Sequence, residues 1–400
     1  MERGVPKICI ATLDPANKGG ILSMMDFFYS KVKEKHPSTL VYNILPGFRS
    51  GTEDLSLAKF IFGSTPKVIR ESIFGMDGLG IQRVFPAFEF FNYILNLRTW
   101  SKSIEGFDKY FAIGGSNNAA APFAFLNKEF MIWVASPLLE DREGRIKREP
   151  FFRKVRDLLS LPFLLWIEKY VFKKTKKILA LSNYTKKNII NKYPFTEDKI
   201  ETIFYPVNIN FFKPKDSPKE KRYILFTGRL SDERKNIKTL ISAFARISPR
   251  FKDLKLILVG GSPSLEMVEM CKNRKVEGSV EFLEFMERES LLSAYQGAEL
   301  FVIPSLQEGL CISGLEAMSC GLPVVSTKCG GPEDFVIDGV NGLLCENNDE
   351  VDMAEKLMKF FDMSTDARKK MSIAAREHIV TNHNPEKIWE KFEKNIFQNE

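Results

Sequence analysis

The sequence is poor in the residues that build metal centres and disulfide frameworks. Its 400 residues include three histidines and six cysteines, and no two cysteines form a C-x-x-C pair. A structural zinc needs a cluster of these ligands, and disulfide-stapled domains are far richer in cysteine. We therefore expect reduced, mostly buried thiols, no metal site and no cofactor.

Long apolar runs are also missing. The best candidate, Leu158–Ile167, is broken by Pro162 and falls well short of the roughly 18 apolar residues that span a bilayer. The first residues are polar and lead into a strand-like stretch, which is not the pattern of a signal peptide. We expect a cytoplasmic chain.

The length and the charge distribution predict two domains with different partners. Four hundred residues exceed what one hydrophobic core usually organises. The net charge of +7 is uneven, because residues 1–206 hold 31 Lys and Arg against 21 Asp and Glu, whereas the remainder holds 27 against 30. The basic half is expected to meet an anionic partner such as phosphate, lipid headgroups or nucleic acid.

Short apolar, β-branched or aromatic runs alternate with helical patterns along the whole chain. This alternation is typical of parallel sheets whose strands are buried on both faces. The runs predict strands at Lys7–Thr12, Leu40–Ile44, Tyr110–Ile113, Phe130–Val134, Lys177–Leu181, Thr202–Phe204, Tyr223–Thr227, Lys255–Val259, Val280–Phe282, Leu300–Ile303 and Pro323–Ser326. We expect two doubly wound, Rossmann-like α/β domains, with a ligand cleft between their facing strand ends.

A break in the pattern near residue 206 divides the two domains. Residues 1–206 form the first, a charged and proline-containing linker spans 207–222, and residues 223–383 form the second. The tail, 384–400, is expected to be an amphipathic helix that packs back on the first domain.

The most informative stretch is 300–346. There a predicted strand ends, a loop with Glu308 and Gly309 follows, and a helix opens around Gly314 to Glu316. Free N–H groups at a helix N-terminus attract phosphate, and fixed carboxylates orient sugar hydroxyls. Two isolated glutamates would be ordinary loop and helix-start acids, but the surrounding order of glycines and Gly-Leu-Pro favours a site.

This stretch resembles glycosyltransferase family 4, a family of retaining enzymes with the two-domain GT-B fold, whose E-x7-E motif matches Glu308 and Glu316. The resemblance covers nearly all of residues 177–346. It implies a hexosyltransferase (EC 2.4) that moves a sugar from a UDP- or GDP-sugar to a hydroxyl of a glycan or lipid-linked acceptor without a metal. Further matching segments are Gly228-Arg229-Leu230, Lys235-Asn236, Ser182-Asn183-Tyr184, Tyr205-Pro206-Val207-Asn208 and Gly330-Gly331-Pro332-Glu333.

The resemblance also implies roles for individual residues. Glu308 would accept hydroxyls of the transferred sugar, and Glu316 would accept those of the ribose. Arg229 and Lys235 would neutralise the leaving diphosphate, and Phe285 would border the base. The remaining donor contacts would come from Gly19, Gly20, Gly228, Gly309, Leu310, Cys311, Ile312 and Ser313.

The two cations also make sense without the resemblance. Arg229 and Lys235 follow the predicted strand Tyr223–Thr227, so they would lie at its carboxyl end. Fixed cations there stabilise the charge that develops on a leaving diphosphate. Alone, the charged run 232–235 would equally fit a solvated face.

The acceptor side is less defined. Gly19 and Gly20 after the first strand form an anion cradle or a simple tight turn, with Lys18 as a contact. Relatives carry a histidine or an acid after the strand matching Phe130–Val134; here the candidates are Ser136, Glu140 and Asp141. His36, His378 and His383 lie in polar contexts and are expected to carry no chemistry.

Cys311 stands where relatives usually have glycine. Its side chain would either narrow the pocket for the donor sugar or pack inward. This departure motivates an alternative, a catalytically inactive protein of the same fold that binds nucleotide sugars or polyanions. A phosphorylase or an epimerase with the same two domains is a weaker third reading.

Residues 145–177 are basic and amphipathic. They hold 11 Lys and Arg against three Asp and Glu, interleaved with aromatic and aliphatic residues. Such a pattern fits a helix on an anionic membrane surface, which would make the protein peripheral on the inner face, or a core helix with a basic solvent face. Nucleic acid is not expected, because no recognition motif accompanies the charge.

Overall fold

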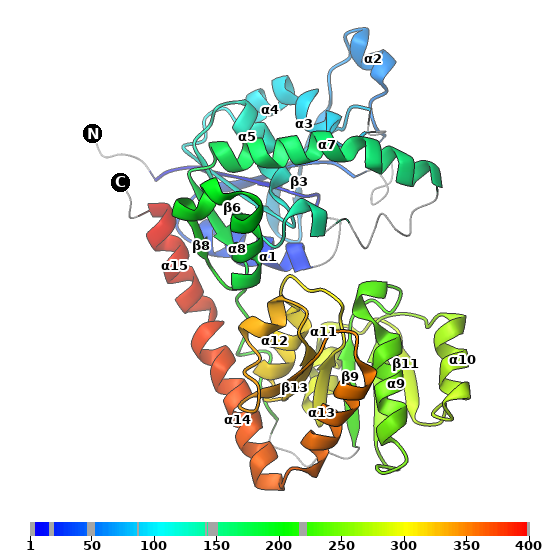
Figure 1. Cartoon of the computed structure of the whole chain (residues 1–400). Helices are drawn as coiled ribbons and strands as arrows, with labels where there is room; N and C mark the ends of the chain where they lie inside the picture. Colours follow the sequence, from blue (N-terminus) through cyan, green and yellow to red (C-terminus); the bar gives the residue numbers. More distant parts are fainter. Residues whose placement is uncertain are drawn as a thin grey trace. The chain divides into compact units, whose positions relative to one another are not determined.

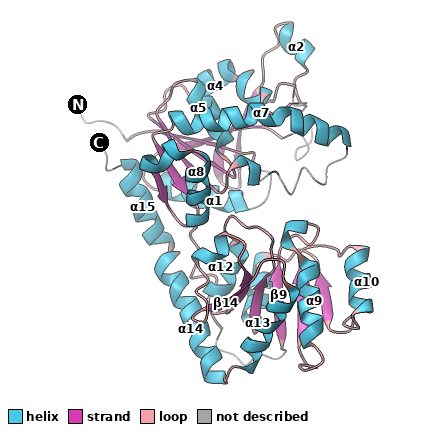
Figure 2. Cartoon of the chain, viewed as in Figure 1, coloured by secondary structure: helices cyan, strands magenta, loops and turns pink. Residues whose placement is uncertain are grey.

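The computed structural model describes residues 5–15, 20–45, 53–85, 88–140, 142, 151–215 and 222–397. The chain divides into two compact units, Met1–Ile203 and Phe204–Glu400 (Figure 1). Each unit is built on one sheet with helices on both of its faces (Figure 2).

Unit 1 contains an eight-stranded sheet in the order β3-β4-β2-β1-β5-β6-β7-β8. All neighbouring strands pair in parallel except β3 and β4, which form an antiparallel hairpin at one edge. The strands are β1 (Ile8–Thr12), β2 (Ser38–Asn43), β3 (Val68–Ile73), β4 (Met76–Ile81), β5 (Lys109–Gly114), β6 (Phe130–Val134), β7 (Lys177–Ala180) and β8 (Ile200–Thr202).

The helices of unit 1 bury apolar stripes against this sheet. Strand β1 is buried along its whole length, and Met24, Phe28 and Val32 of α1 are buried too. The helices are α1 (Gly20–Lys33), α2 (Leu57–Ile61), α3 (Phe91–Ile94), α4 (Leu97–Ser103), α5 (Ala121–Phe125), α7 (Phe151–Lys174) and α8 (Asn183–Lys192), with short 3-10 turns at Asn117–Ala120 and Pro194–Lys199.

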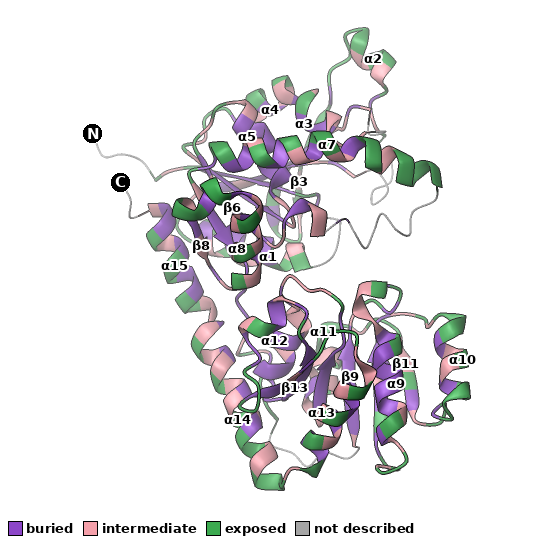
Figure 3. Cartoon of the chain, viewed as in Figure 1, coloured by how far each residue is buried: buried purple, intermediate pink, exposed green. Residues whose placement is uncertain are grey.

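Unit 2 contains a six-stranded, fully parallel sheet in the order β11-β10-β9-β12-β13-β14. Its strands are short and buried, and they appear purple in Figure 3. They are β9 (Tyr223–Thr227), β10 (Lys255–Val259), β11 (Val280–Leu283), β12 (Leu300–Ile303), β13 (Val324–Thr327) and β14 (Gly342–Cys345).

The helices of unit 2 begin at side-chain caps and end where glycine, proline or polar residues interrupt the apolar pattern. Ser264, Asp349 and Ser364 each accept a backbone N–H of the helix that follows. The helices are α9 (Ile237–Ile247), α10 (Leu265–Asn273), α11 (Arg288–Gly297), α12 (Ile312–Ser319), α13 (Glu350–Asp362), α14 (Thr365–Asn382) and α15 (Pro385–Phe397), with 3-10 turns at Glu233–Lys235 and Gly331–Asp334.

The predicted fold class is confirmed, but the strand assignment was incomplete. The pattern missed β3, β4 and β14, and the strand predicted at Thr202–Phe204 lies at Ile200–Thr202. Strand β3 is largely exposed at the sheet edge, β4 holds two glycines and β14 follows a glycine-rich turn, so none carries a continuous run of β-branched residues. The expectation of purely parallel sheets was wrong for the β3–β4 hairpin.

The described part of the predicted linker packs on unit 2. The Phe212 carbonyl accepts hydrogen bonds from Ser319 Oγ and Arg376, and the Arg376 guanidinium also reaches the Ile209 carbonyl. The tail forms the predicted helix, α15, whose Ile388, Trp389 and Phe392 are buried. Its packing on the first domain stays a prediction.

All six cysteines are free, and five of them are buried, as expected. Within the described ranges, no helix is long and apolar enough to cross a bilayer.

Candidate functional site

The strand order of unit 2 marks one point on the sheet as the place for a ligand. Strand β9 is first in the chain, β10 and β11 lie on one side of it, and β12 to β14 lie on the other. The loops after β9 and β12 therefore leave the same carboxyl edge in opposite directions. In doubly wound sheets, ligands bind in the crevice at such a switch point.

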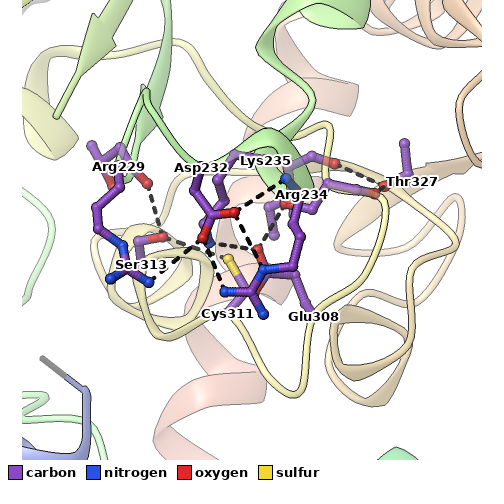
Figure 4. Close-up of polar contacts among 11 residues, drawn as sticks. Arg229, Asp232, Arg234, Lys235, Glu308, Cys311, Ser313 and Thr327 are labelled. Carbon is purple, nitrogen blue, oxygen red and sulfur yellow. Dashed lines mark hydrogen bonds and ion pairs between the residues drawn. The ribbon is translucent and has the colours of Figure 1, made fainter. Parts of the chain in front are cut away.

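Lys235 and Glu308 meet at this switch point. Lys235 ends the loop after β9, Glu308 lies in the loop after β12, and the Lys235 Nζ atom donates to Glu308 Oε1 at 2.6 Å (Figure 4). Both side chains are mostly buried. Burial works against the charge of Lys235, but the Glu308 carboxylate, together with Cys311 and Asp232, outweighs it and raises the pKa of Lys235. The site thus holds a fixed ammonium–carboxylate pair.

The Glu308 carboxylate is held on one side only. Ser305 Oγ donates to the same Oε1 atom at 2.7 Å, and Thr327 Oγ1 fixes Ser305 through its carbonyl at 2.6 Å. Within the described part of the chain, Oε2 accepts no hydrogen bond. One carboxylate oxygen is therefore positioned by the protein and the other can accept from a ligand hydroxyl.

Backbone contacts lock the loops together. Leu306 N donates to the Arg234 carbonyl at 2.7 Å, which joins the β9 and β12 loops. Glu308 N donates to the Cys329 carbonyl and accepts through its own carbonyl from Gly331 N. A Cβ atom on Gly331 would lie 2.4 Å from the Gly309 carbonyl oxygen, so only glycine permits this approach.

Arg229 and Arg234 play different parts beside the pair. Arg234 is engaged by Asp232, at 3.2 Å from Nε and 2.9 Å from Nη2, which makes it a structural cation. The Arg229 side chain is 67% exposed and lies 3.5 Å from Asp232. Of the two predicted cations, Lys235 is therefore buried in the site, while Arg229 lies at its open rim (Figure 4).

The donor loop leads into the N-terminus of α12. The helix starts at Ile312, two residues before the predicted position, and its first-turn N–H groups have no acceptor within the helix. Ser313 Oγ donates to the Thr227 carbonyl at 3.3 Å, which ties the helix start to the end of β9. The positive end of the α12 dipole thus points into the same space as Lys235 and Arg229.

Cys311 occupies the residue before α12 in a left-handed conformation, with φ of 72°. This region suits glycine and strains other residues. The Cys311 Sγ atom lies 3.5 Å from Ser313 Oγ and is partly exposed. Burial, with Glu308 next in importance, raises the pKa of the thiol to about 11, so it stays protonated.

Glu316 lies one turn into α12, in a drier place than Glu308. Its Oε2 accepts from the Tyr295 hydroxyl at 3.1 Å, and that hydroxyl also lies 3.1 Å from Thr227 Oγ1. Burial raises the pKa of Glu316 to about 7, although the Tyr295 hydrogen bond and the Arg288 charge oppose it. Tyr295 and Thr227 were missed by the sequence reasoning, since neither carries a motif.

Phe285 lies beyond β11, at the carboxyl edge of the same sheet. Its ring is 67% exposed, and a Cβ on Gly261 would lie 3.3 Å from it. Gly228 and Gly260 hold the neighbouring loops close, because a Cβ on Gly260 would lie 1.9 Å from the Gly228 carbonyl oxygen. An exposed aromatic face supported by glycine backbone is a suitable platform for a planar ligand.

The acceptor-side candidates of unit 1 lie after β6. Ser136 N donates to the Gly115 carbonyl at 2.8 Å. Glu140 Oε1 accepts from Asn188 of α8 at 2.6 Å. Gly20 is the first residue of α1, whereas Lys18, Gly19 and Asp141 lie outside the described residues.

The structure adds Asn118 to the acceptor side. Unit 1 has its own switch point between β1 and β5, and Asn118 follows β5. Its amide is buried, and among the described residues neither Nδ2 nor Oδ1 has a hydrogen-bond partner. The run Gly114-Gly115-Ser116-Asn117-Asn118 was the available sequence signal.

The expectation for the histidines was wrong for His383. This side chain is buried, and its Nδ1 lies 2.8 Å from the Tyr205 carbonyl. Burial lowers the pKa of His383 to about 4, so the ring is neutral. His383 fixes the segment that begins unit 2 and has a structural role. Within the described residues, no group of three or more His, Cys, Asp or Glu could hold a metal ion.

Comparison with known proteins agrees with this geometry. Residues 207–378 match the family model described as glycosyl transferases group 1. A 212-residue segment is 27% identical to D-inositol 3-phosphate glycosyltransferase of Corynebacterium diphtheriae, covering 48% of this chain and 49% of that protein. The chain thus spans about half the length of the curated relatives it matches first.

Solved structures share the whole fold. Sucrose-phosphate synthase from Thermosynechococcus elongatus is 17% identical, with a TM-score of 0.75 and 98% coverage of both chains. HepE from Anabaena, solved in complex with UDP, is 15% identical, with a TM-score of 0.73 over 98% of this chain and 100% of that one. The two-unit arrangement of parallel α/β sheets is therefore that of GT-B glycosyltransferases.

Proposed function

We propose that this chain, which carries a group 1 glycosyl transferase domain at residues 207–378, is a glycosyltransferase that uses a nucleoside diphosphate sugar. The Lys235–Glu308 pair beside the N-terminus of α12 is the observation that carries the proposal. It brings a cation, a carboxylate with one open oxygen and a positive helix end to one switch point.

The geometry suggests how the donor would lie. Glu308 Oε2 would accept a hydroxyl of the donor sugar, while Lys235, the α12 N–H groups and Arg229 would surround the diphosphate. Glu316 lies further along α12 and would accept from the ribose, and Phe285 would border the base. The sugar therefore sits toward Glu308 and the nucleoside toward Glu316.

The chemistry follows from where charge develops. When the glycosidic bond breaks, negative charge grows on the leaving diphosphate, and a preorganised cation stabilises that state more than the ground state. We propose that the sugar is transferred with retention, by attack of the acceptor hydroxyl from the side that the diphosphate leaves. The diphosphate takes the electron pair of the broken bond, and the acceptor proton passes to it.

The comparisons support the donor class. HepE was solved with UDP and with UDP-glucose, and a structural neighbour, TarM, was solved with UDP, α-GlcNAc-glycerol and a glycan ligand. We propose a UDP- or GDP-linked hexose as donor and a hydroxyl of a glycan or lipid-linked molecule as acceptor. We also propose that no metal is needed, because Lys235, Arg229 and the α12 terminus supply the positive charge.

The test is a panel of UDP- and GDP-sugars incubated with the purified chain, with and without acceptors, read as release of nucleoside diphosphate. We expect turnover with at least one donor, unchanged by EDTA. Glu308→Gln should lower it about 10²–10³-fold. Glu266→Gln is the matched control, because Glu266 also accepts a 2.6 Å contact from a lysine, Lys238, but both side chains are exposed.

Two results would contradict the proposal. Saturable nucleotide binding without turnover on any acceptor would identify an inactive binding protein of the same fold. Phosphorolysis, with inorganic phosphate consumed in place of an acceptor, would identify a phosphorylase.

A further inference from the structure

Helix α7 of unit 1 has two apolar faces, and only one is buried. Leu164, Ile167 and Val171 recur at three- or four-residue spacing and are fully buried in the core of unit 1. A second series recurs at the same spacings on another face of the helix and is exposed. This outer stripe consists of Phe152, Val155, Leu159, Phe163 and Trp166.

The exposure of the outer stripe is large and lies mostly toward the N-terminus of α7. Phe152 is 86% exposed, Leu159 59% and Trp166 54%. In Figure 3 the N-terminal turns of α7 are green on the side away from the sheet. Single exposed apolar residues are normal on a soluble protein, but a contiguous apolar stripe marks a surface that another body covers.

Aromatic contacts hold the stripe outward instead of burying it. The Phe163 ring stacks on Phe90, with centroids 4.6 Å apart. The Trp166 ring stacks on Phe125 at 5.9 Å and on Tyr170 at 5.7 Å. These stacks fix rigid rings at the surface, and tryptophan and tyrosine are the residues that favour a membrane–water interface.

The charges around the stripe identify its partner. Arg153, Lys154 and Arg156 lie in the first two turns, and Asp157 is the one acid between residues 151 and 166. The helix N-terminus adds positive potential. A second copy of this chain in a symmetric contact would bring like charges together, whereas anionic lipid headgroups would complement them.

We propose that the outer stripe of α7, with its basic first turns, docks on an anionic lipid surface. The helix would lie in the plane of the interface, with the stripe among the acyl chains and the cations among the phosphates. This interaction is independent of whether the chain transfers sugars, and it assigns the predicted basic stretch to both of its original readings. The N-terminal half of α7 is interfacial, and the inner stripe is core.

The same helix also reaches the acceptor side. Glu168, buried on α7, accepts the backbone N–H of Leu138 at 2.7 Å, and Leu138 lies between Ser136 and Glu140 in the loop after β6. Lys192 Nζ and the Tyr193 hydroxyl also donate to Glu168, at 2.7 and 2.6 Å. Docking of α7 would therefore place this loop next to the membrane. If the proposed function holds, the acceptor is lipid-linked.

Trp166 gives a direct readout. Of the four tryptophans, Trp100, Trp133 and Trp389 are buried, whereas Trp166 lies on the outer stripe. We expect brominated phosphatidylglycerol vesicles to quench the fluorescence of the wild-type chain. Trp166→Phe should lose that quenching and still co-sediment with the vesicles. Phosphatidylcholine vesicles should bind far more weakly, and 0.5 M salt should release the chain from anionic ones.

Two sets of variants test the two parts of the surface. Each basic residue near an anionic surface contributes about five-fold to partitioning, so R153Q/K154Q/R156Q should lower it about a hundredfold. F152S/L159S should lower it on both kinds of vesicle. The matched controls are K272Q/K369Q/K370Q and L265S/I373S, which change exposed residues of unit 2 and should bind as the wild type does.

The proposal is overturned by equal partitioning onto neutral and anionic vesicles, by no binding at all, or by stripe variants that bind like the wild type. A stripe variant that changes the oligomeric state without affecting lipid binding would show that the stripe is a protein interface. Thermal shift with UDP on every variant keeps this outcome separate from the proposed function, because the donor site lies in unit 2.

Discussion

The ammonium of Lys235 lies 2.6 Å from the carboxylate of Glu308, although 73 positions separate the two residues in the chain. The contact exists because β9 and β12 are neighbours in the sheet, so their carboxyl ends open onto the same edge. A partly buried pair of this kind depends on both members, since either charge left alone in the site would be poorly solvated.

We predict that the Lys235–Glu308 pair is energetically coupled. In a double-mutant cycle with Lys235→Met and Glu308→Gln, urea unfolding should give a coupling energy of about 1–3 kcal/mol. The exposed pair Lys238–Glu266, with the same 2.6 Å separation, should give about 0.2–1 kcal/mol in the same cycle. Equal coupling in the two cycles would show that burial adds nothing at the site.

Donor binding should depend on the ionisation of Glu316. The pKa of this buried carboxyl is raised to about 7, so it is mainly protonated at pH 6 and mainly ionised at pH 8. Only the ionised form accepts two ribose hydroxyls, and UDP affinity should rise across this range. Glu316→Gln in the same buffers removes the contribution of the carboxyl and leaves that of the ligand phosphate. If the two pH profiles coincide, Glu316 does not contact the nucleoside.

Replacing Cys311 by glycine should stabilise the protein. Cys311 holds φ of 72°, a conformation that costs a non-glycine residue about 1 kcal/mol. We expect Cys311→Gly to raise the free energy of unfolding by about 0.5–1 kcal/mol. Lys275→Gly is a positive control, because Lys275 is exposed with φ of 57°. A loss of stability in Cys311→Gly alone would mean that the thiol packs favourably enough to outweigh its backbone strain.

His383 should make stability fall with acid. Its pKa is lowered to about 4 in the folded chain, against about 6.5 when unfolded. Above pH 6.5 the ring is neutral in both states and its contribution is complete. As the pH falls from 6.5 to 4, the unfolded chain binds the proton first, and up to about 3 kcal/mol is lost.

The control for this effect is His383→Asn, which retains a donor near the Tyr205 carbonyl and has no titrating ring. Denaturant unfolding at several pH values should give a flatter profile for the variant between pH 6.5 and 4. Parallel profiles would show that another group causes the loss.

The sequence was sufficient for much of the fold. Nine of the predicted strands overlap the observed ones almost fully, because a strand buried on both faces must be a continuous apolar run, as in Tyr223–Thr227 and Leu300–Ile303. Edges are different. Strand β3 is exposed and polar, so nothing local distinguishes it from a loop.

The sequence by itself determined which residues stand at the strand ends: Lys235 after β9, Glu308 after β12 and Glu316 at the start of α12. Periodicity and glycine placement are local properties, and they fix local structure. Only the tertiary structure decided that Lys235 and Glu308 touch, that Tyr295 and Thr227 enclose Glu316, and that His383 is buried. Contact, burial and pKa depend on strand order and on what packs over each side chain, and no single segment of the chain contains that information.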